Sequence, residues 1–85
     1  MFKAFVAFDR KALSEGNLTA KLKELIAVAV AHTNGCPHYI DVHVKQVKKH
    51  RASKEEMAES IMVATVLKAG FAMTQGVNAL VAYDE

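Results

Sequence analysis

The stretch Asn34–His43, NGCPHYIDVH, holds the only cysteine and the only proline of the chain. Cys36 precedes Pro37, a residue that suits the first turn of a helix because an N–H there has no helical partner. A cysteine at a helix start meets backbone N–H groups with partial positive charge, which favour the reactive thiolate. Tyr39 follows one turn later and His43 two turns later, on the same helical stripe. This spacing predicts a thiol nucleophile beside a base; the alternative is an inert, packed cysteine and a packed or solvated histidine.

Glu24 is the second residue that could take part in chemistry, because its carboxylate directly precedes the apolar run LIAVAVA, residues 25–31. Its helical stripe continues to His32, which we include as a supporting residue together with Tyr39. A carboxylate near a core needs a partner, and a histidine is a suitable one. If two helices fold back about Gly35, Glu24 lies ~15 Å along one arm and His43 ~9 Å along the other. This mismatch favours a bridging water over a direct bond; the alternative is a surface Glu24 paired with a neighbouring lysine.

Periodicity and stop signals predict an all-α fold of five helices in a single domain, residues 1–85. No strand pattern, repeat or linker interrupts the chain. The first expected helix is Phe2–Leu13, and the second is capped by Thr19 and ends near Thr33, before Asn34–Gly35. The third runs from Pro37 to about Lys49. The capping box Ser53–Glu56 opens the fourth, which Gly70 ends, and a weaker fifth helix over Phe71–Tyr83 contains Gly76.

Composition narrows the location and the partners of the protein. Apolar residues make up 52% of the chain, but neither dense run, 25–31 or 61–66, approaches the ~20 residues of a membrane span. The first ten residues do not resemble a secretory signal, and one cysteine cannot form an internal disulfide. We therefore expect a cytoplasmic protein with a free thiol and no membrane contact.

Charge and histidine spacing argue against two further classes of site. The net charge is +2, and the basic cluster at residues 45–51 comes without a base-reading motif, so we do not expect nucleic-acid binding. The four histidines and the cysteine lack the tight paired spacing of zinc ligands. We expect neither a metal nor another cofactor.

The segment KELIAVAVAHTNGCPHYIDVHVKQV, residues 23–47, resembles the alkylhydroperoxidase D-like (AhpD-like) branch of the carboxymuconolactone decarboxylase family. The signature of that branch is Glu, eleven residues, Cys-x-x-Cys, three residues, His. Glu24, Cys36 and His43 match it with every spacing intact, whereas Tyr39 replaces the second cysteine. Including the capped helix that follows, the resemblance covers about two-thirds of the chain.

The resemblance implies a peroxiredoxin-like oxidoreductase in which Glu24 and His43 relay a proton, through water, to activate a thiol against a hydroperoxide. Without the second cysteine a disulfide cycle within one chain is impossible, so Cys36 would form a sulfenic acid that an external thiol, or Cys36 of another subunit, resolves. The Tyr39 hydroxyl would hydrogen-bond to Cys36 or His43. Two alternatives remain: acid and base chemistry on a small carboxylated lactone by His43 and Glu24, and a non-catalytic oligomer that retains the fold.

Surplus apolar helix surface also predicts self-association, because an 85-residue chain cannot cover it alone. The resemblance implies a homo-oligomer, a trimer or a hexamer built from dimers. We expect subunit contacts through the first helix and through a face bearing Ile61, Met62 and Val66, with Cys36 close to an interface.

Overall fold

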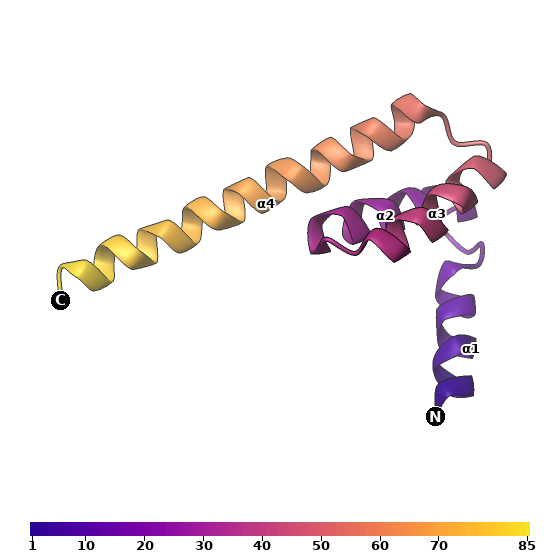
Figure 1. Cartoon of the computed structure of the whole chain (residues 1–85), viewed down its shortest axis with the longest axis horizontal. Coiled ribbons are helices and arrows are strands. Elements are labelled where there is room, and N and C mark those ends of the chain that lie inside the picture. Colours follow the sequence, from indigo (N-terminus) through magenta and orange to yellow (C-terminus); the bar gives the residue numbers. More distant parts are fainter.

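The computed structural model describes all residues, 1–85, and contains four helices and no strand. The helices are α1 (Phe2–Leu13), α2 (Ala20–Asn34), α3 (Pro37–Lys49) and α4 (Lys54–Tyr83). The all-α prediction is confirmed. Figure 1 shows α2 and α3 side by side, with α1 and the long α4 extending from them in different directions.

The prediction of five helices is wrong, because α4 is one helix of 30 residues that runs through Gly70 and Gly76. Neither glycine adopts a left-handed conformation; Gly35 is the one glycine with positive φ. A glycine inside a helix costs about 1 kcal/mol relative to alanine, yet it keeps its N–H and C=O for the hydrogen-bond ladder. Alanine, leucine and methionine lie near both glycines, and no proline interrupts the ladder, so the helix continues.

The predicted helix ends are confirmed at three places. The Thr19 side chain accepts a hydrogen bond from the Leu22 N–H at 3.1 Å and caps α2. Gly35 ends α2 in the left-handed region, with φ 67°. Ser53 and Glu56 form the reciprocal capping box of α4, with bonds of 3.0 and 2.8 Å. Local hydrogen-bonding chemistry therefore sets where these helices begin and end.

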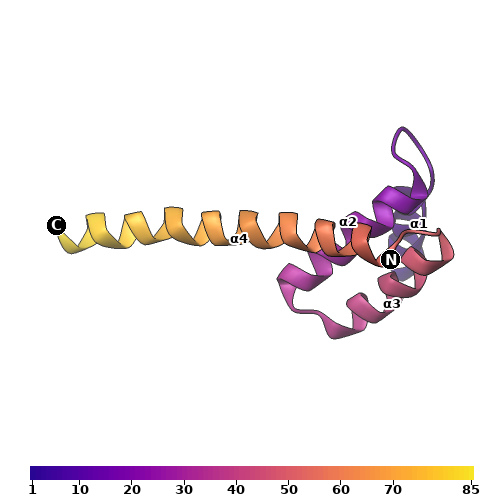
Figure 2. The same cartoon turned by 90° about the horizontal axis from the view of Figure 1, so that it is seen from above.

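The hydrophobic core lies where α2, α3 and the first half of α4 meet (Figure 2). Its buried centre consists of Leu25, Val28 and Val47. Met57 and Ile61 of α4 pack against this centre, as do Val44 and Ala52. The side of α4 that carries Met57 and Ile61 thus faces its own protomer, and Ile61 remains partly exposed there.

Helix α1 is attached to this core mainly through α2. The Lys23 Nζ donates hydrogen bonds to the Ala12 and Ser14 carbonyl oxygens, at 2.9 and 2.6 Å. These bonds satisfy carbonyls at the C-terminal end of α1, where a cation is also favoured by the helix dipole. The lysine therefore fixes the turn that positions α1 beside α2.

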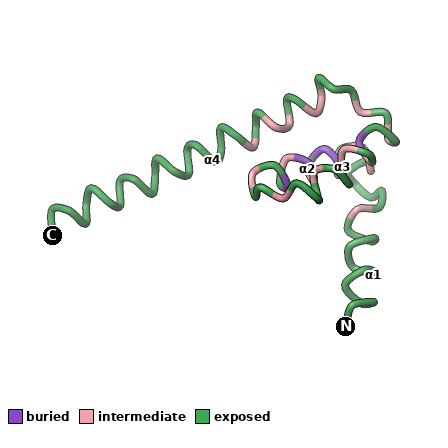
Figure 3. The backbone as a smooth tube through the Cα atoms, viewed as in Figure 1, coloured by how far each residue is buried: buried purple, intermediate pink, exposed green.

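The protomer is extended, and its hydrophobic core is small. Its radius of gyration is 16.5 Å, against about 12 Å for a compact domain of this length. Five residues are buried, and every residue from Thr65 to the C-terminus is exposed (Figure 3). Judged by length and composition alone, α4 is long and apolar enough to cross a membrane, with an 18-residue window of mean hydropathy 1.2. The second half of α4 thus presents apolar surface with nothing from its own protomer to cover it.

Candidate functional site

Glu24 is a charged residue in the core of the protein, with 5% of its surface exposed. Its Oε2 atom lies 2.7 Å from Nδ1 of His43. The expected water bridge is wrong: the two side chains bond directly, so α2 and α3 are offset along their axes rather than level at the turn. The alternative partners are engaged elsewhere, since Lys21 pairs with Glu56 at 2.8 Å and Lys23 binds the α1 carbonyls.

The direct bond fixes the hydrogen-bonding roles of His43. A carboxylate accepts only, so Nδ1 must carry the proton and donate it to Glu24. In the neutral ring, Nε2 then has a free lone pair and can act as a base. The His43 side chain is 13% exposed, so the ring lies at the margin between core and solvent. Glu24 thus orients the ring and would stabilise an imidazolium if Nε2 took a proton.

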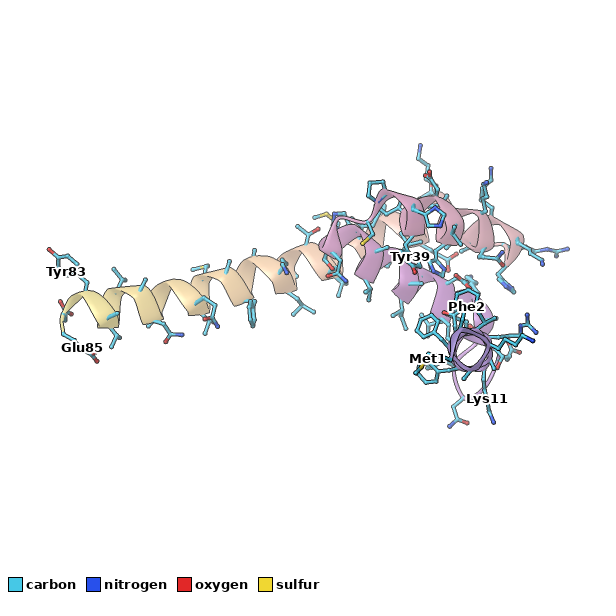
Figure 4. The ribbon with its side chains drawn as sticks, turned by 60° about the horizontal axis from the view of Figure 1, so that its bottom comes forward. Met1, Phe2, Lys11, Tyr39, Tyr83 and Glu85 are labelled. Carbon is cyan, nitrogen blue, oxygen red and sulfur yellow. The ribbon has the colours of Figure 1, made fainter.

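The Tyr39 ring stacks on the ring of His43. The two rings are stacked, with centroids 6.2 Å apart and an interplanar angle of 12°. The Tyr39 hydroxyl makes no hydrogen bond within the chain, so the expected bond to Cys36 or His43 is absent. Stacking accounts for this, because the phenol lies along the imidazole face instead of pointing its oxygen at it. Figure 4 shows Tyr39 on the side of the α2–α3 pair that faces α1.

Cys36 occupies the N-cap of α3, directly before Pro37, as the sequence predicts. Its backbone N–H donates to the Ala31 carbonyl at 3.1 Å, which completes the turn after α2. The thiol is half-buried and makes no side-chain cap bond to α3. Its polar neighbour is the Asn34 carbonyl oxygen, 4.0 Å from Sγ. The sulfur therefore lies beside the open start of α3 without accepting from its N–H groups.

A groove of about 400 Å³ brings Cys36, Tyr39 and His43 together. It has the size of a small-molecule site, and most of its lining is apolar. Glu24 lies behind His43 and outside the lining. Residues of α1, α2 and α3 form the walls: Phe5, Phe8, Asp9, Ala12, Leu13, Ala27, Val30, Ala31, Asn34, Cys36, Tyr39 and His43.

The wall supplied by α1 was not predicted from the sequence. Phe5 and Phe8, one turn apart, and Asp9 all line the groove, although the chain separates them from Cys36 by more than 25 residues. Their helical spacing marks an aromatic face, but nothing local shows which surface that face meets. Asp9 is the one carboxylate of the lining, and no lysine or arginine takes part. The groove therefore suits an uncharged, apolar ligand better than an anion.

His32 does not join this site. Its side chain is exposed and lines a shallow depression with Thr65 and Lys68 of α4. A larger groove of about 610 Å³ between α2 and α4 is almost wholly apolar and contains neither cysteine nor histidine. The Cys36 groove is therefore the part of the protein where a nucleophile and a base share a cavity.

Comparison with known proteins matches residues 1–82 to the model of the carboxymuconolactone decarboxylase family. An uncharacterized protein of the cox locus of Paracoccus denitrificans is 40% identical over 82 residues, which are 96% of this chain and 74% of that protein. An uncharacterized protein of Cupriavidus necator is 35% identical over 81 residues, 95% of this chain and 72% of that protein.

A solved structure agrees with this assignment. The crystal structure of a protein from Methanobacterium thermoautotrophicum superimposes with a TM-score of 0.84 at 29% identity, covering 92% of this chain and 90% of that chain. Sequence and fold point the same way: the chain belongs to the carboxymuconolactone decarboxylase family.

Proposed function

We propose that the protein is a one-cysteine, peroxiredoxin-like thiol oxidoreductase that reduces small apolar hydroperoxides. The observation that carries the proposal is the buried Glu24–His43 pair beside the only thiol of the chain. A carboxylate this deeply buried is costly unless it is bonded to a charged or polar partner. Cys36 and His43 line one groove, and these residue types are those of an activated nucleophile in which the base is oriented by a third group.

The first chemical step oxidises Cys36. His43 Nε2 takes the thiol proton, and the thiolate sulfur attacks the terminal oxygen of ROOH. The S–O bond forms as the O–O bond breaks, giving a sulfenic acid. The leaving alkoxide receives the proton held by His43 and departs as ROH. Glu24 stabilises the transient imidazolium and is not itself consumed.

Two further steps return the thiol. A first external thiol, R′SH, attacks the sulfenic acid, releasing water and forming a mixed disulfide on Cys36. A second R′SH displaces the first as R′SSR′ and regenerates the Cys36 thiol. An external reductant is required because the chain has no other cysteine, and Tyr39 cannot form a disulfide.

The alternative activity, acid and base chemistry on a carboxylated lactone, would use His43 and Glu24 without the thiol. Such a substrate is an anion. The groove offers it no lysine or arginine and presents the carboxylate of Asp9 instead. Like charge in a partly closed site is repulsive, so the lining favours the hydroperoxide.

The test is peroxide-dependent consumption of a small dithiol, measured with purified protein and cumene hydroperoxide. We expect turnover that Cys36→Ser abolishes and that His43→Gln and Glu24→Gln lower at least tenfold. His32→Gln is the matched control, because this histidine is exposed and outside the groove. Trapping with dimedone should label Cys36 in a peroxide-dependent manner.

Two results would contradict the proposal. One is turnover that persists in Cys36→Ser; lactone conversion by that same variant would establish the acid–base alternative. The other is a wild-type thiol that reacts with peroxide no faster than free cysteine and is unaffected by His43→Gln. That result would leave a non-catalytic protein.

A further inference from the structure

One wall of the Cys36 groove belongs to α1. The lining residues of this helix are Phe5, Phe8, Asp9, Ala12 and Leu13. Their spacing places them all on one side of the helix. Lys23 fixes this wall, because its Nζ donates a hydrogen bond to the Ala12 carbonyl oxygen. Glu24, the next residue of α2, holds His43. Neighbouring residues of α2 therefore position both the wall and the base.

Aromatic side chains are concentrated in this groove. The chain has four phenylalanines, two tyrosines and no tryptophan. Three of these six rings line the groove: Phe5 and Phe8 on α1, and Tyr39 on α3. Tyr39 lies on the side of the α2–α3 pair that faces α1 (Figure 4), where it stacks on His43. Two walls of the groove thus carry aromatic rings.

These three rings keep most of their surface free. Phe5 is 59% exposed, Phe8 69% and Tyr39 53%. Tyr39 pairs with the rings of His38 and His43, whereas neither phenylalanine pairs with another ring of the chain. Aromatic rings attract one another in offset-stacked and edge-to-face arrangements at centroid distances of about 4.5–7 Å. Phe5 and Phe8 can therefore take an aromatic partner that the chain itself does not supply.

The size of the groove argues for a ligand larger than hydrogen peroxide. The groove measures about 400 Å³. Hydrogen peroxide has two oxygen atoms and occupies roughly the volume of two water molecules, ~60 Å³. It would leave most of the apolar lining in contact with water. A ligand with a hydrocarbon group removes that lining from water, which is favourable in proportion to the apolar area covered.

We propose that Phe5 and Phe8 bind an uncharged aryl group between the α1 wall and Tyr39, and that they determine which substrates the groove accepts. Under the proposed function, on which the identity of the reacting group rests, this aryl group is the organic part of the hydroperoxide. The alcohol ROH that leaves after the first chemical step keeps the same organic group. Inert aryl alcohols therefore report on the site without any turnover.

Asp9 adds a charge preference to this site. It is the one carboxylate of the lining, and it forms no ion pair within the chain. The Lys23 ammonium, which binds the Ala12 carbonyl oxygen, lies outside the lining. An unpaired carboxylate repels an anionic ligand, and because Asp9 is exposed, salt weakens the repulsion. The groove should therefore bind an uncharged aryl group more tightly than one that carries a carboxylate.

The first experiment titrates the full chain, with its thiol reduced, with inert alcohols and follows binding by NMR. The aryl ligand is 2-phenyl-2-propanol. Its matched aliphatic control is 2-cyclohexyl-2-propanol, which has at least as much apolar surface and no aromatic ring. Ligands of this size should bind with a Kd on the order of 1 mM. We expect the aryl alcohol to bind at least about threefold more tightly, which hydrophobic burial alone would not produce.

Substitutions on α1 locate the binding. Phe5→Ala and Phe8→Ala should each weaken binding of 2-phenyl-2-propanol at least about threefold. Both side chains are exposed, so far-UV circular dichroism should remain helical. Phe8→Leu keeps an apolar side chain without a ring and should reduce the preference for the aryl alcohol. Phe2→Ala, on the same helix but outside the groove, and Phe71→Ala, in the α2–α4 groove, should leave the affinity unchanged.

The charge preference is tested with the para-carboxylated derivative of the aryl alcohol. At low salt it should bind wild type at least about threefold more weakly than the parent alcohol, and Asp9→Asn should remove that difference. A carboxylated alcohol that binds wild type as tightly as its parent would overturn the assignment of an uncharged ligand.

A kinetic measurement connects the site to the proposed function. Phe5→Ala and Phe8→Ala should each lower the ratio of kcat/KM for cumene hydroperoxide to that for hydrogen peroxide at least about threefold. Phe2→Ala should leave this ratio unchanged. Binding of the aryl alcohol without oxidation of Cys36 would refute the oxidoreductase and leave the aryl site standing. Turnover without such binding, at an unchanged ratio in both α1 variants, would refute the aryl site alone.

Three results of the alcohol titration would also overturn the proposal. The first is the absence of saturable binding to wild type. The second is equal affinity for the aryl and the cyclohexyl alcohol, which would indicate apolar contact without aromatic recognition. The third is binding that Phe71→Ala abolishes and that Phe5→Ala and Phe8→Ala leave intact, which would place the ligand in the α2–α4 groove.

Discussion

At the residue scale, the Glu24–His43 bond holds the candidate site together and also contributes to stability. Glu24 is nearly buried, and His43 is its one hydrogen-bonding partner from another helix. Removing one member of such a pair leaves the other poorly solvated. The two roles can be separated, because a stability defect and a reactivity defect are measured independently.

We expect Glu24→Ala to lower the free energy of unfolding by ~3 kcal/mol, because it leaves His43 without its hydrogen-bond partner and opens a cavity beside it. Glu24→Gln should cost less, since an amide oxygen still accepts from Nδ1. Urea denaturation at fixed protein concentration measures both. Glu59→Ala is the control: Glu59 is exposed, and its loss should change stability by less than about 0.5 kcal/mol. Equal costs for Glu24→Ala and Glu59→Ala would mean that the bond contributes nothing.

Tyr39 decides whether a dithiol cycle can operate. Tyr39→Cys puts a second thiol in the groove one turn after Cys36, next to the His43 ring. We expect this variant to form an intramolecular disulfide with peroxide and to raise dithiol-dependent turnover, because resolution no longer needs an external thiol. Mass spectrometry detects the bridge as a loss of two hydrogens.

The matched control for that change is His38→Cys, which puts a thiol at the neighbouring position, outside the groove lining. It should not gain turnover. If both variants behave alike, or if the two thiols of Tyr39→Cys never close a disulfide, the geometry that a dithiol cycle requires is absent from this protein.

At the element scale, we expect the start of α4 to be sensitive to acid. Lys21 donates a hydrogen bond to the Glu56 carboxylate, and the Ser53 backbone N–H donates another; together they lower the pKa of Glu56 below its ordinary 4.5. A depressed folded-state pKa stabilises the fold above the unfolded-state pKa, and that stability is lost as pH falls through the folded value.

We therefore expect wild-type stability to fall between pH 5 and pH 3 more steeply than that of Glu56→Gln, because glutamine cannot titrate. Ser53→Ala should cost ~1 kcal/mol at neutral pH through loss of the cap. Thermal melts across this pH range measure both effects. Parallel pH curves for wild type and Glu56→Gln would show that the carboxylate is not engaged.

The turn between α3 and α4 contains a strained residue. Arg51 has φ 63°, the one non-glycine residue with positive φ. The left-handed region costs an L-residue roughly 1–2 kcal/mol, whereas glycine loses only its greater unfolded-state freedom. We expect Arg51→Gly to raise the unfolding free energy by ~0.5–1 kcal/mol. Arg51→Ala, which removes the charge but keeps the Cβ, should not stabilise the protein and serves as the comparison.

At the scale of the whole molecule, the protomer has a small hydrophobic core. Five residues are buried, and every residue of α4 from Thr65 onward is exposed. If partner copies supply the missing contacts, folding and association are linked by mass action. The midpoint of thermal unfolding should then rise by several degrees when the protein concentration is raised about a hundredfold. A wild-type midpoint independent of concentration would contradict the linkage.

The sequence by itself determined the features that depend on neighbours along the chain. Thr19, Gly35 and Ser53 bond within a few residues of themselves, so their sites of capping can be identified without tertiary structure. The same holds for the stripe of Cys36, Tyr39 and His43, which follows from helical periodicity. The expected stop at Gly70 failed for an equally local reason, since one glycine does not outweigh a continuing hydrogen-bond ladder.

Only the tertiary structure decided which surfaces meet. The offset of α2 against α3 turns the expected water bridge into a direct Glu24–His43 bond. The attachment of α1 through Lys23 brings Phe5 and Phe8 to the groove. These outcomes depend on contacts between residues far apart in the chain, whose relative placement is set by packing over several helices together and not by periodicity within any one of them.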